Sequence, residues 1–272
     1  MFALLGSPLI ASQSDDGFRA PSISDFFPSG VLFAGTPFQI DRIWVIRIVA
    51  TLLLLTVFVV AARKAKVVPG RFQLAIEFLL GFVREQVVEE MLGKERGKQF
   101  VPMITTIFFA IVAFNLTAVI PGLNLAGSAR IGFPLLLALW VLVTYFKVGI
   151  AKHGLGGYLS TSLFPPSVRK MPYLYLIVTP IEILQVFVVR PLSLAIRLTL
   201  NMVAGHITLV LTLLGTNYLI TQASPALRPV GVLTLAGGLF VTLFEIFVAF
   251  LQAYIFTLLA SAYINMALEE EH

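Results

Sequence analysis

Long apolar runs separated by short polar stretches are the first feature of this chain. One run extends from residue 43 to 62, and twenty residues of α-helix at 1.5 Å each reach about 30 Å, the thickness of the hydrocarbon core of a bilayer. Arg47 lies near one end of this run, where a long side chain can reach the membrane surface. We therefore expect about five membrane-spanning helices, near residues 43–62, 101–120, 131–151, 171–219 and 229–268.

Residues 70–92 have a different pattern. Apolar residues recur there at helical spacing, at Phe72, Ile76, Leu79, Leu80, Val83, Val87 and Met91. Charged and amide residues gather on another side of the same helix. This pattern predicts an amphipathic helix that lies on the cytoplasmic membrane surface and does not cross the membrane.

The last two apolar segments are longer than a bilayer requires. Residues 171–219 and 229–268 would form helices about 73 and 60 Å long at 1.5 Å per residue. Either each segment breaks, or both helices are strongly tilted and form a hairpin joined near Ser224, Pro225 and Pro229. We expect the hairpin of two long, tilted helices.

Basic residues are unevenly distributed between the two ends of the predicted spans. Of 19 basic residues, 12 fall on one side: Arg63, Lys64, Lys66, Arg71, Arg84, Lys94, Arg96, Lys98, Lys147, Lys152, Arg169 and Lys170. The positive-inside rule makes that side cytoplasmic, with the N-terminus outside and the C-terminus inside. We expect an extracytoplasmic segment over 1–42 and a single membrane domain over 43–272. Residues 1–12 lack a positively charged start, which disfavours a cleaved signal peptide.

Composition agrees with this assignment. Hydrophobic residues make up 58% of the chain and charged residues 12%, whereas about a quarter of a soluble domain is charged. The sequence thus predicts an all-α polytopic membrane protein without a separate soluble domain. The absence of cysteine excludes disulfides and cysteine-ligated metals. The net charge of +5 does not indicate a nucleic-acid partner, because the basic residues flank apolar spans.

The apolar segment RPLSLAIRLTLNMVAGH, residues 190–206, contains two arginines. A charge at mid-bilayer costs from ~3 to more than ~10 kcal/mol and usually marks a function. Arg197 lies near the middle of its segment and stays protonated. A fixed cation suits a counter-charge to a carboxylate and cannot relay protons. Since this chain has no obvious carboxylate at that depth, we expect the partner on another chain.

Other polar residues lie near Arg197 on the two long helices. Asn201 follows it by four residues on the same helical face, and His206 can titrate near neutral pH. Glu245 and Gln252 share a face of the last helix. If the two helices pack antiparallel, Glu245 can approach His206, and Gln252 can approach Arg197.

Structural roles also remain open for these residues. Arg190 can reach the membrane surface or pair with Glu182. Packing or hydrogen bonds between helices would explain His206, Asn201, Glu245 and Gln252. A structural role is weakest for Arg197, because the chain offers it no obvious counter-charge.

Residues 190–206 resemble the signature of the a subunit, or subunit 6, of F-type ATP synthases. The matching residues are Arg190-Pro191, Ser193-Leu194, Arg197-Leu198, Asn201-Met202 and Ala204-Gly205-His206. Residues 251–272 resemble the C-terminus of that family, and Asn115-Leu116 with Pro121 resembles a shorter motif. The resemblance extends over about residues 40–272 and is similar to the bacterial form.

The resemblance implies a non-catalytic, proton-translocating stator subunit with no nucleotide site and no cofactor. It implies two half-channels beside a ring of c subunits, with Arg197 as the essential arginine between them. The arginine couples ion flow to ring rotation and ATP synthesis. Positions associated with the proton pathway in this family correspond to His206, Glu245, Asn201, Gln252, Glu182 and Asn115.

The resemblance also implies the partners and the location. The partners are c-ring subunits, b-type peripheral stalk subunits, membrane lipids and protons or Na⁺, with no nucleic acid. The location is the bacterial plasma membrane. This chain departs from the family at Ala118, where relatives often have glycine or an acid, and in the spacing from Glu182 to the Arg-Pro pair, which is one residue longer than in many relatives.

Two other classes of protein are alternatives to this one. A stand-alone secondary transporter or antiporter often contains internal repeats, and no convincing repeat is present here. A membrane enzyme would be indicated by motifs such as HExxH, GxSxG or a glycine-rich phosphate loop. The sequence contains none of these three motifs.

Overall fold

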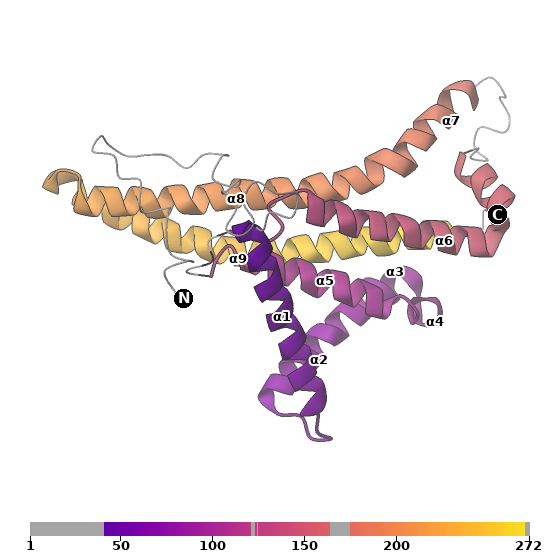
Figure 1. Cartoon of the computed structure of the whole chain (residues 1–272), viewed down its shortest axis with the longest axis horizontal. Helices are drawn as coiled ribbons and strands as arrows, with labels where there is room; N and C mark the ends of the chain where they lie inside the picture. The colour runs from indigo at the N-terminus through magenta and orange to yellow at the C-terminus, as the bar shows by residue number, and fades with distance from the viewer. Residues whose placement is uncertain (1–40, 121–122, 124, 164–174, 270–272) are drawn as a thin grey trace. The chain divides into compact units, whose positions relative to one another are not determined.

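The computed structural model describes residues 41–120, 123, 125–163 and 175–269 (Figure 1). In these ranges every regular element is a helix. Four helical stretches are long and apolar enough to cross a membrane, and a fifth apolar helix, Val101–Leu116, is shorter. The chain is therefore an all-α polytopic membrane protein. Most of the expected extracytoplasmic segment, residues 1–40, lies outside the described residues.

The main helices follow the apolar runs of the sequence. They are α1 (Arg42–Arg63), α5 (Val101–Leu116), α6 (Gly132–Leu163), α7 (Tyr175–Leu184), α8 (Arg190–Thr221) and α9 (Arg228–Leu268). The amphipathic stretch forms α2 (Arg71–Val83), a π turn (Arg84–Glu89) and α3 (Glu90–Leu92), followed by α4 (Lys94–Gly97).

Two helices differ in length from the sequence-based expectation. The span expected at 101–120 ends as a helix at Leu116. The hydroxyl of Thr117, the next residue, lies within hydrogen-bonding distance of two carbonyls, those of Phe114 at 2.6 Å and Leu125 at 2.9 Å, between which it shares its one hydrogen. The span expected at 131–151 continues to Leu163, with an interruption at Gly154. Gly154 has φ 72° and ψ 165°, a conformation that glycine adopts without a steric penalty.

The two long segments do not break into separate spans within the described residues. Helical structure continues from Tyr175 to Thr221 with a π turn over Gln185–Val189. Helix α9 runs for 41 residues without interruption, which corresponds to about 60 Å. The connection between α8 and α9 lies at residues 222–227 and contains the expected Ser224 and Pro225.

The described chain divides into two compact units. Of the described residues, the first unit contains 41–60, 110–120, 123, 125–130 and 200–252, and the second contains 61–109, 131–163, 175–199 and 253–269. In the first unit, the later part of α8 and the earlier part of α9 run antiparallel, side by side (Figure 1). The hydroxyl of Thr216 donates to that of Thr234 at 3.0 Å near the connection.

The face of α9 that packs on α8 repeats every seven residues. Gly231, Gly238, Glu245 and Gln252 are all buried, and residues seven apart return to nearly the same side of a helix. A Cβ added at Gly231 would meet Ile220 Cγ1 at 2.7 Å. Glycine therefore lets α8 and α9 approach closely near their connection. Further along α9, the same buried face carries the polar residues Glu245 and Gln252.

The first unit also joins the start of α1 to the loop that follows α5. The Arg47 Nε donates to the carbonyl of Gly127 at 2.7 Å, and Arg42 Nη2 donates to that of Leu123 at 3.0 Å. Arg130 forms an ion pair with Asp41 at 2.5 Å. Arg47 is thus held by the loop that follows α5, and the expectation that it extends to the membrane surface stays a prediction.

The second unit contains the amphipathic stretch. Val83, Val87 and Val88 are fully buried, whereas Phe72 and Phe78 near its start are exposed. The ring of Phe82 lies 5.8 Å from that of Tyr254 on α9. The stretch therefore uses its apolar side for packing within the protein at one end and leaves it exposed at the other.

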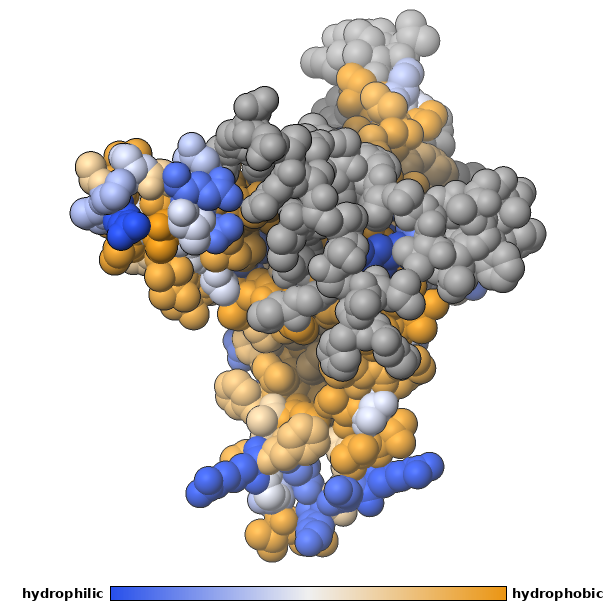
Figure 2. Space-filling model, turned by 60° about the vertical axis from the view of Figure 1, so that its left-hand side comes forward, coloured by the Kyte–Doolittle hydropathy of each residue, from blue (hydrophilic) through white to orange (hydrophobic). Residues whose placement is uncertain are grey.

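Apolar side chains form much of the exposed surface, as the orange regions of Figure 2 show. On α1 the exposed residues include Leu52, Leu53 and Leu55. Monomeric soluble proteins rarely expose extended apolar patches of this kind. The surface is that expected of helices that contact lipid or neighbouring membrane subunits.

Candidate functional site

One face of α8 carries Arg197. Ile196, Leu200, Asn201 and Ala204 are exposed together with it. The other side of this helix is buried, at Leu194, Ala195, Leu198 and Met202. In the part of the chain that the structure describes, the Arg197 guanidinium has no hydrogen bond or ion pair. A partner for this charge is therefore not provided by the described residues.

Asn201 and Gln252 form a polar contact between α8 and α9 in the first unit. The Asn201 Nδ2 donates to Gln252 Oε1 at 2.8 Å. Gln252 is 3% exposed, whereas Asn201 is exposed on α8. The hydrogen bond therefore joins a buried residue between α8 and α9 to an exposed residue on α8. The expected approach of Gln252 to Arg197 stays a prediction.

His206 and Glu245 form a second polar layer in the same unit. Both residues are 4% exposed. Glu245 packs where Gly205 has no side chain: a Cβ added at Gly205 would overlap the Glu245 carboxyl group. Gly205 directly precedes His206, so the structure brings the acid to the turn of α8 that bears the histidine. The sequence motif contains this glycine, but only the structure shows what occupies its space.

Asn115 lies at the C-terminal end of α5, in the first unit. It is 1% exposed, and its Oδ1 accepts a hydrogen bond from the hydroxyl of Ser128. Its Nδ2 has no partner among the described residues. The sequence does not indicate Ser128 as a site residue, since a single serine in a loop carries no sequence signal. The Nδ2 of Asn115 is therefore a buried donor near the outer loop that has no partner among the described residues.

Glu182 and Arg190 belong to the second unit. The Arg190 guanidinium lies over the ring of Tyr263, 5.5 Å from its centroid, in the geometry of a cation–π contact. The ion pairs among the described residues do not include Glu182 and Arg190. The π turn between the two residues changes their relative orientation around the helix. An aromatic partner thus replaces the pairing that the sequence left open.

The candidate residues combine two side chains that can gain and lose a proton, His206 and Glu245, with the fixed cation of Arg197. Among the described residues, no three His, Asp or Glu side chains are placed to hold a metal ion. Buried polar side chains between the longest helices of a membrane protein mark an ion pathway or a helix contact. The fold and this set of residues define a polytopic membrane protein of the ion-conducting class.

Comparison with known proteins gives the family. Residues 43–265 match the model of the ATP synthase A chain. The chain is 44% identical to ATP synthase subunit a of Rhodococcus erythropolis, over 97% of this chain and 95% of the relative. It is 34% identical to the subunit of the same name from Nocardioides sp., over 97% and 98% of the two chains. The chain belongs to the ATP synthase A chain family.

This membership decides between an ATP synthase subunit and a stand-alone transporter. The family contributes to the proton-translocating membrane sector, Fo, of the ATP synthase. None of the relatives favours a stand-alone transporter or antiporter. The chain is therefore a subunit of a membrane complex.

Proposed function

We propose that this chain is a non-catalytic subunit that conducts protons through Fo and couples their passage to rotation of a ring of c subunits. Family membership supports the role in Fo. The observation that carries the mechanism is Arg197, an exposed cation in an apolar helix without a partner among the described residues. Its cost in a membrane is high unless another group compensates it.

A carboxylate on each c subunit is the compensating group in this proposal. As a ring carboxylate passes Arg197, the fixed positive charge favours its deprotonated form. The same charge repels a proton that would otherwise move directly between the two sides. Each proton must then bind the ring and travel with it, driven by about 2.3 kcal/mol per charge per 100 mV of membrane potential.

The two polar layers have different roles because their groups differ chemically. His206 and Glu245 can each gain and lose a proton, so this layer transfers protons to and from the ring. Asn201 and Gln252 cannot change charge, so they hold the helices together and orient groups near Arg197. Asn115 and Glu182 extend the pathway toward the outer and the inner surface respectively.

The topology completes the proposal. The uneven distribution of basic residues supports a cytoplasmic C-terminus and an N-terminus outside the plasma membrane. In this proposal α1, α5, α6, the helical stretch from α7 through α8, and α9 cross the membrane. Helix α2 lies on the cytoplasmic surface, and α8 and α9 are strongly tilted. Partners are the c-ring, b-type peripheral stalk subunits and membrane lipids.

The decisive experiment is ATP-driven proton pumping in inverted membrane vesicles that carry Arg197→Ala. We expect the complex to assemble and hydrolyse ATP without forming a pH gradient. Ile196→Ala, on the same exposed face of α8, is the matched control and should pump normally. Pumping by Arg197→Ala near the wild-type rate would contradict the proposal. Pumping in a sodium-free buffer identifies the coupled ion. If pumping requires Na⁺, Na⁺ takes the place of the proton in this mechanism.

A second experiment tests the layer of His206 and Glu245. Gly205→Ala places a methyl group in the space of the Glu245 carboxyl, so we expect pumping to fall about tenfold or more. Gly215→Ala is the matched control on the same helix, because nothing lies within 4 Å of a Cβ at Gly215. Equal pumping by the two variants would show that the position of Glu245 is unimportant.

A further inference from the structure

The π turn before α8 leaves one backbone carbonyl without a donor from its own helix. The N–H of Arg190 donates to the carbonyl of Gln185, five residues earlier. The carbonyl of Val186 would next use the N–H of residue 191, but Pro191 has none. Buried carbonyls in proteins are almost always hydrogen-bonded. Another group must therefore satisfy Val186.

A tyrosine from a different helix supplies that hydrogen bond. The hydroxyl of Tyr145, on α6, donates to the carbonyl of Val186 at 2.8 Å. Tyr145 is 2% exposed and Val186 is 3% exposed, so water does not compete for this contact. The hydroxyl of Tyr145 thus donates the hydrogen bond to Val186 that Pro191, which lacks an N–H, cannot donate.

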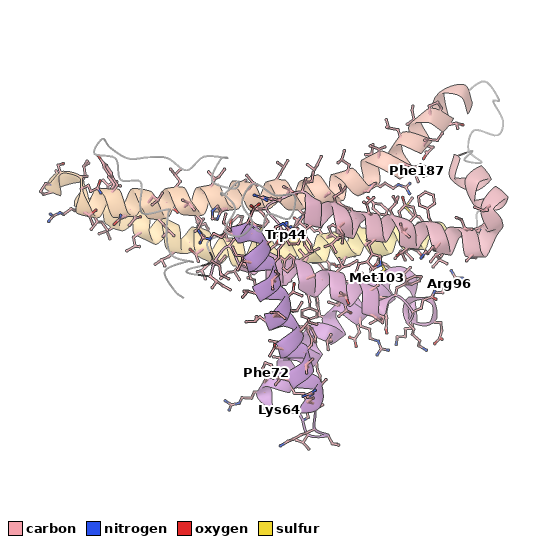
Figure 3. The ribbon with its side chains drawn as sticks, viewed as in Figure 1. Trp44, Lys64, Phe72, Arg96, Met103 and Phe187 are labelled. Carbon is pink, nitrogen blue, oxygen red and sulfur yellow. The ribbon has the colours of Figure 1, made fainter. Side chains whose placement is uncertain are left out.

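Aromatic rings hold the turn on both sides of this hydrogen bond. The ring of Phe146, next to Tyr145, lies 4.9 Å from that of Phe187. Phe187 is labelled in Figure 3, on the π turn between α7 and α8. The ring of Tyr145 lies 6.3 Å from that of Tyr263, which also contacts the Arg190 guanidinium. These contacts lie within the second unit and surround the π turn from its middle to its end.

The position of a π turn determines which way the following residues face. It contains one more residue than an α-helical turn would, and each residue of an α-helix corresponds to about 100° of rotation. Arg197 comes seven residues after Arg190 and is exposed, while its neighbour Leu198 is fully buried. If the π turn were lost, or if the extra residue moved past Arg197, Arg197 would turn by about 100° to the side that Leu198 now occupies, which is buried.

We propose that Tyr145 is a positioning residue for Arg197. By capping the Val186 carbonyl, Tyr145 keeps the π turn at Gln185–Val189 and holds Arg197 on the exposed face of α8. The inference rests on the proposed function for its activity measurement, while its structural measurement is independent of that function.

The first test compares two Tyr→Phe substitutions in the assembled complex. Tyr145→Phe removes the capping hydroxyl and keeps the ring, so we expect ATP-driven pumping per complex to fall about tenfold while ATP hydrolysis continues. Tyr254→Phe is the matched control, since that tyrosine contacts Phe82 through its ring. It should pump within about twofold of wild type. Equal pumping by the two variants would overturn the inference.

A disulfide reports the position of the turn directly. The chain has no cysteine, so Phe146→Cys with Phe187→Cys introduces the only pair. We expect this pair to cross-link under oxidation, and the yield to fall at least threefold when Tyr145→Phe is added. The yield should not change with Tyr254→Phe. An unchanged yield with Tyr145→Phe would show that the hydroxyl does not hold the turn.

Restoring the missing N–H provides a rescue. Pro191→Ala gives residue 191 an N–H that can reach the Val186 carbonyl. In the Pro191→Ala background, adding Tyr145→Phe should change pumping and assembly less than twofold. If Tyr145→Phe lowers pumping or assembly as much in the Pro191→Ala background as in wild type, the capping role is overturned. This test also applies if Tyr145→Phe alone fails to assemble.

The outcomes separate this inference from the proposed function. If Arg197→Ala pumps normally but Tyr145→Phe still lowers the disulfide yield, the proposed function fails and the capping role stands. If Arg197→Ala abolishes pumping and Tyr145→Phe changes neither pumping nor the disulfide yield, the capping role fails and the proposed function stands.

Discussion

Arg47 and Arg197 both lie in apolar helices, yet their charges have different surroundings. The guanidinium of Arg47 donates to the carbonyl of Gly127 at 2.7 Å and reaches that of Arg130 at 3.5 Å. Arg197 is exposed on α8 and has no hydrogen bond or ion pair to any residue that the structure describes. One charge is satisfied within the chain, and the other is available to a partner.

The difference shows that an arginine inside an apolar segment does not indicate function by itself. Arg42 and Arg47 bind loop carbonyls, and Arg130 pairs with Asp41. These charges stabilise the junction between α1 and the outer loop. A charge indicates function when its own chain provides no counter-charge for it. The free-energy cost of that charge in the membrane must then be offset by a group on another molecule.

The largest expected effect concerns Arg197. Arg197→Gln should lower ATP-driven pumping by at least a hundredfold, since an uncharged amide cannot favour the deprotonated form of a ring carboxylate. The amount of subunit retained in the membrane should stay within about twofold of wild type, because an exposed residue without described partners contributes little to folding. Pumping assays and immunoblots of the same vesicles measure both. If the Arg197→Gln subunit is lost from the membrane, Arg197 contributes to folding, as Arg47 is expected to do.

Arg47 should respond in the opposite way. Arg47→Leu removes hydrogen bonds from a charged donor to two carbonyls, which we expect to destabilise the subunit by about 2–4 kcal/mol. The subunit should therefore be less abundant and should inactivate at a lower temperature. Pumping per assembled complex should stay within about twofold. A large loss of pumping at normal abundance would assign Arg47 a role in ion transfer and would remove the contrast.

The ion pair of Asp41 and Arg130 is expected to have a smaller effect. Asp41→Asn keeps the shape but removes the charge, and we expect a loss of about 1–2 kcal/mol, between the values typical of surface and of buried pairs. Arg130→Gln and the double variant complete a double-mutant cycle, read from thermal inactivation of the complex. Additive losses would indicate that the two side chains do not interact.

The smallest effect belongs to Asn201 and Gln252. Their hydrogen bond at 2.8 Å should contribute about 0.6 kcal/mol, as is typical between membrane helices. Asn201→Leu, Gln252→Leu and the double variant measure this value from thermal inactivation. The same variants sharpen the comparison, because Asn201 lies on the face of Arg197 but has a partner within the chain. A coupling energy of zero would leave Asn201 as free as Arg197.

Much of the fold is predictable because its signals are local. Apolar runs give the positions of α1, α6, α8 and α9, and the amphipathic pattern gives the helical stretch from Arg71 to Leu92. The end of α5 at Leu116 was not predictable, since the apolar run expected at 101–120 continues past it. The π turn depends on a tyrosine about forty residues away in the chain.

The sequence by itself determined that this protein is helical, that it belongs in a membrane, and that Arg197 lacks a nearby acid. These properties follow from composition and from spacing along single helices. Only the tertiary structure decided that Arg47 binds the carbonyl of Gly127, 80 residues away, and that Glu245 fills the space at Gly205. The reason is physical: helical periodicity is a property of neighbouring residues, whereas the partner of a charge or of a missing side chain depends on how distant segments pack.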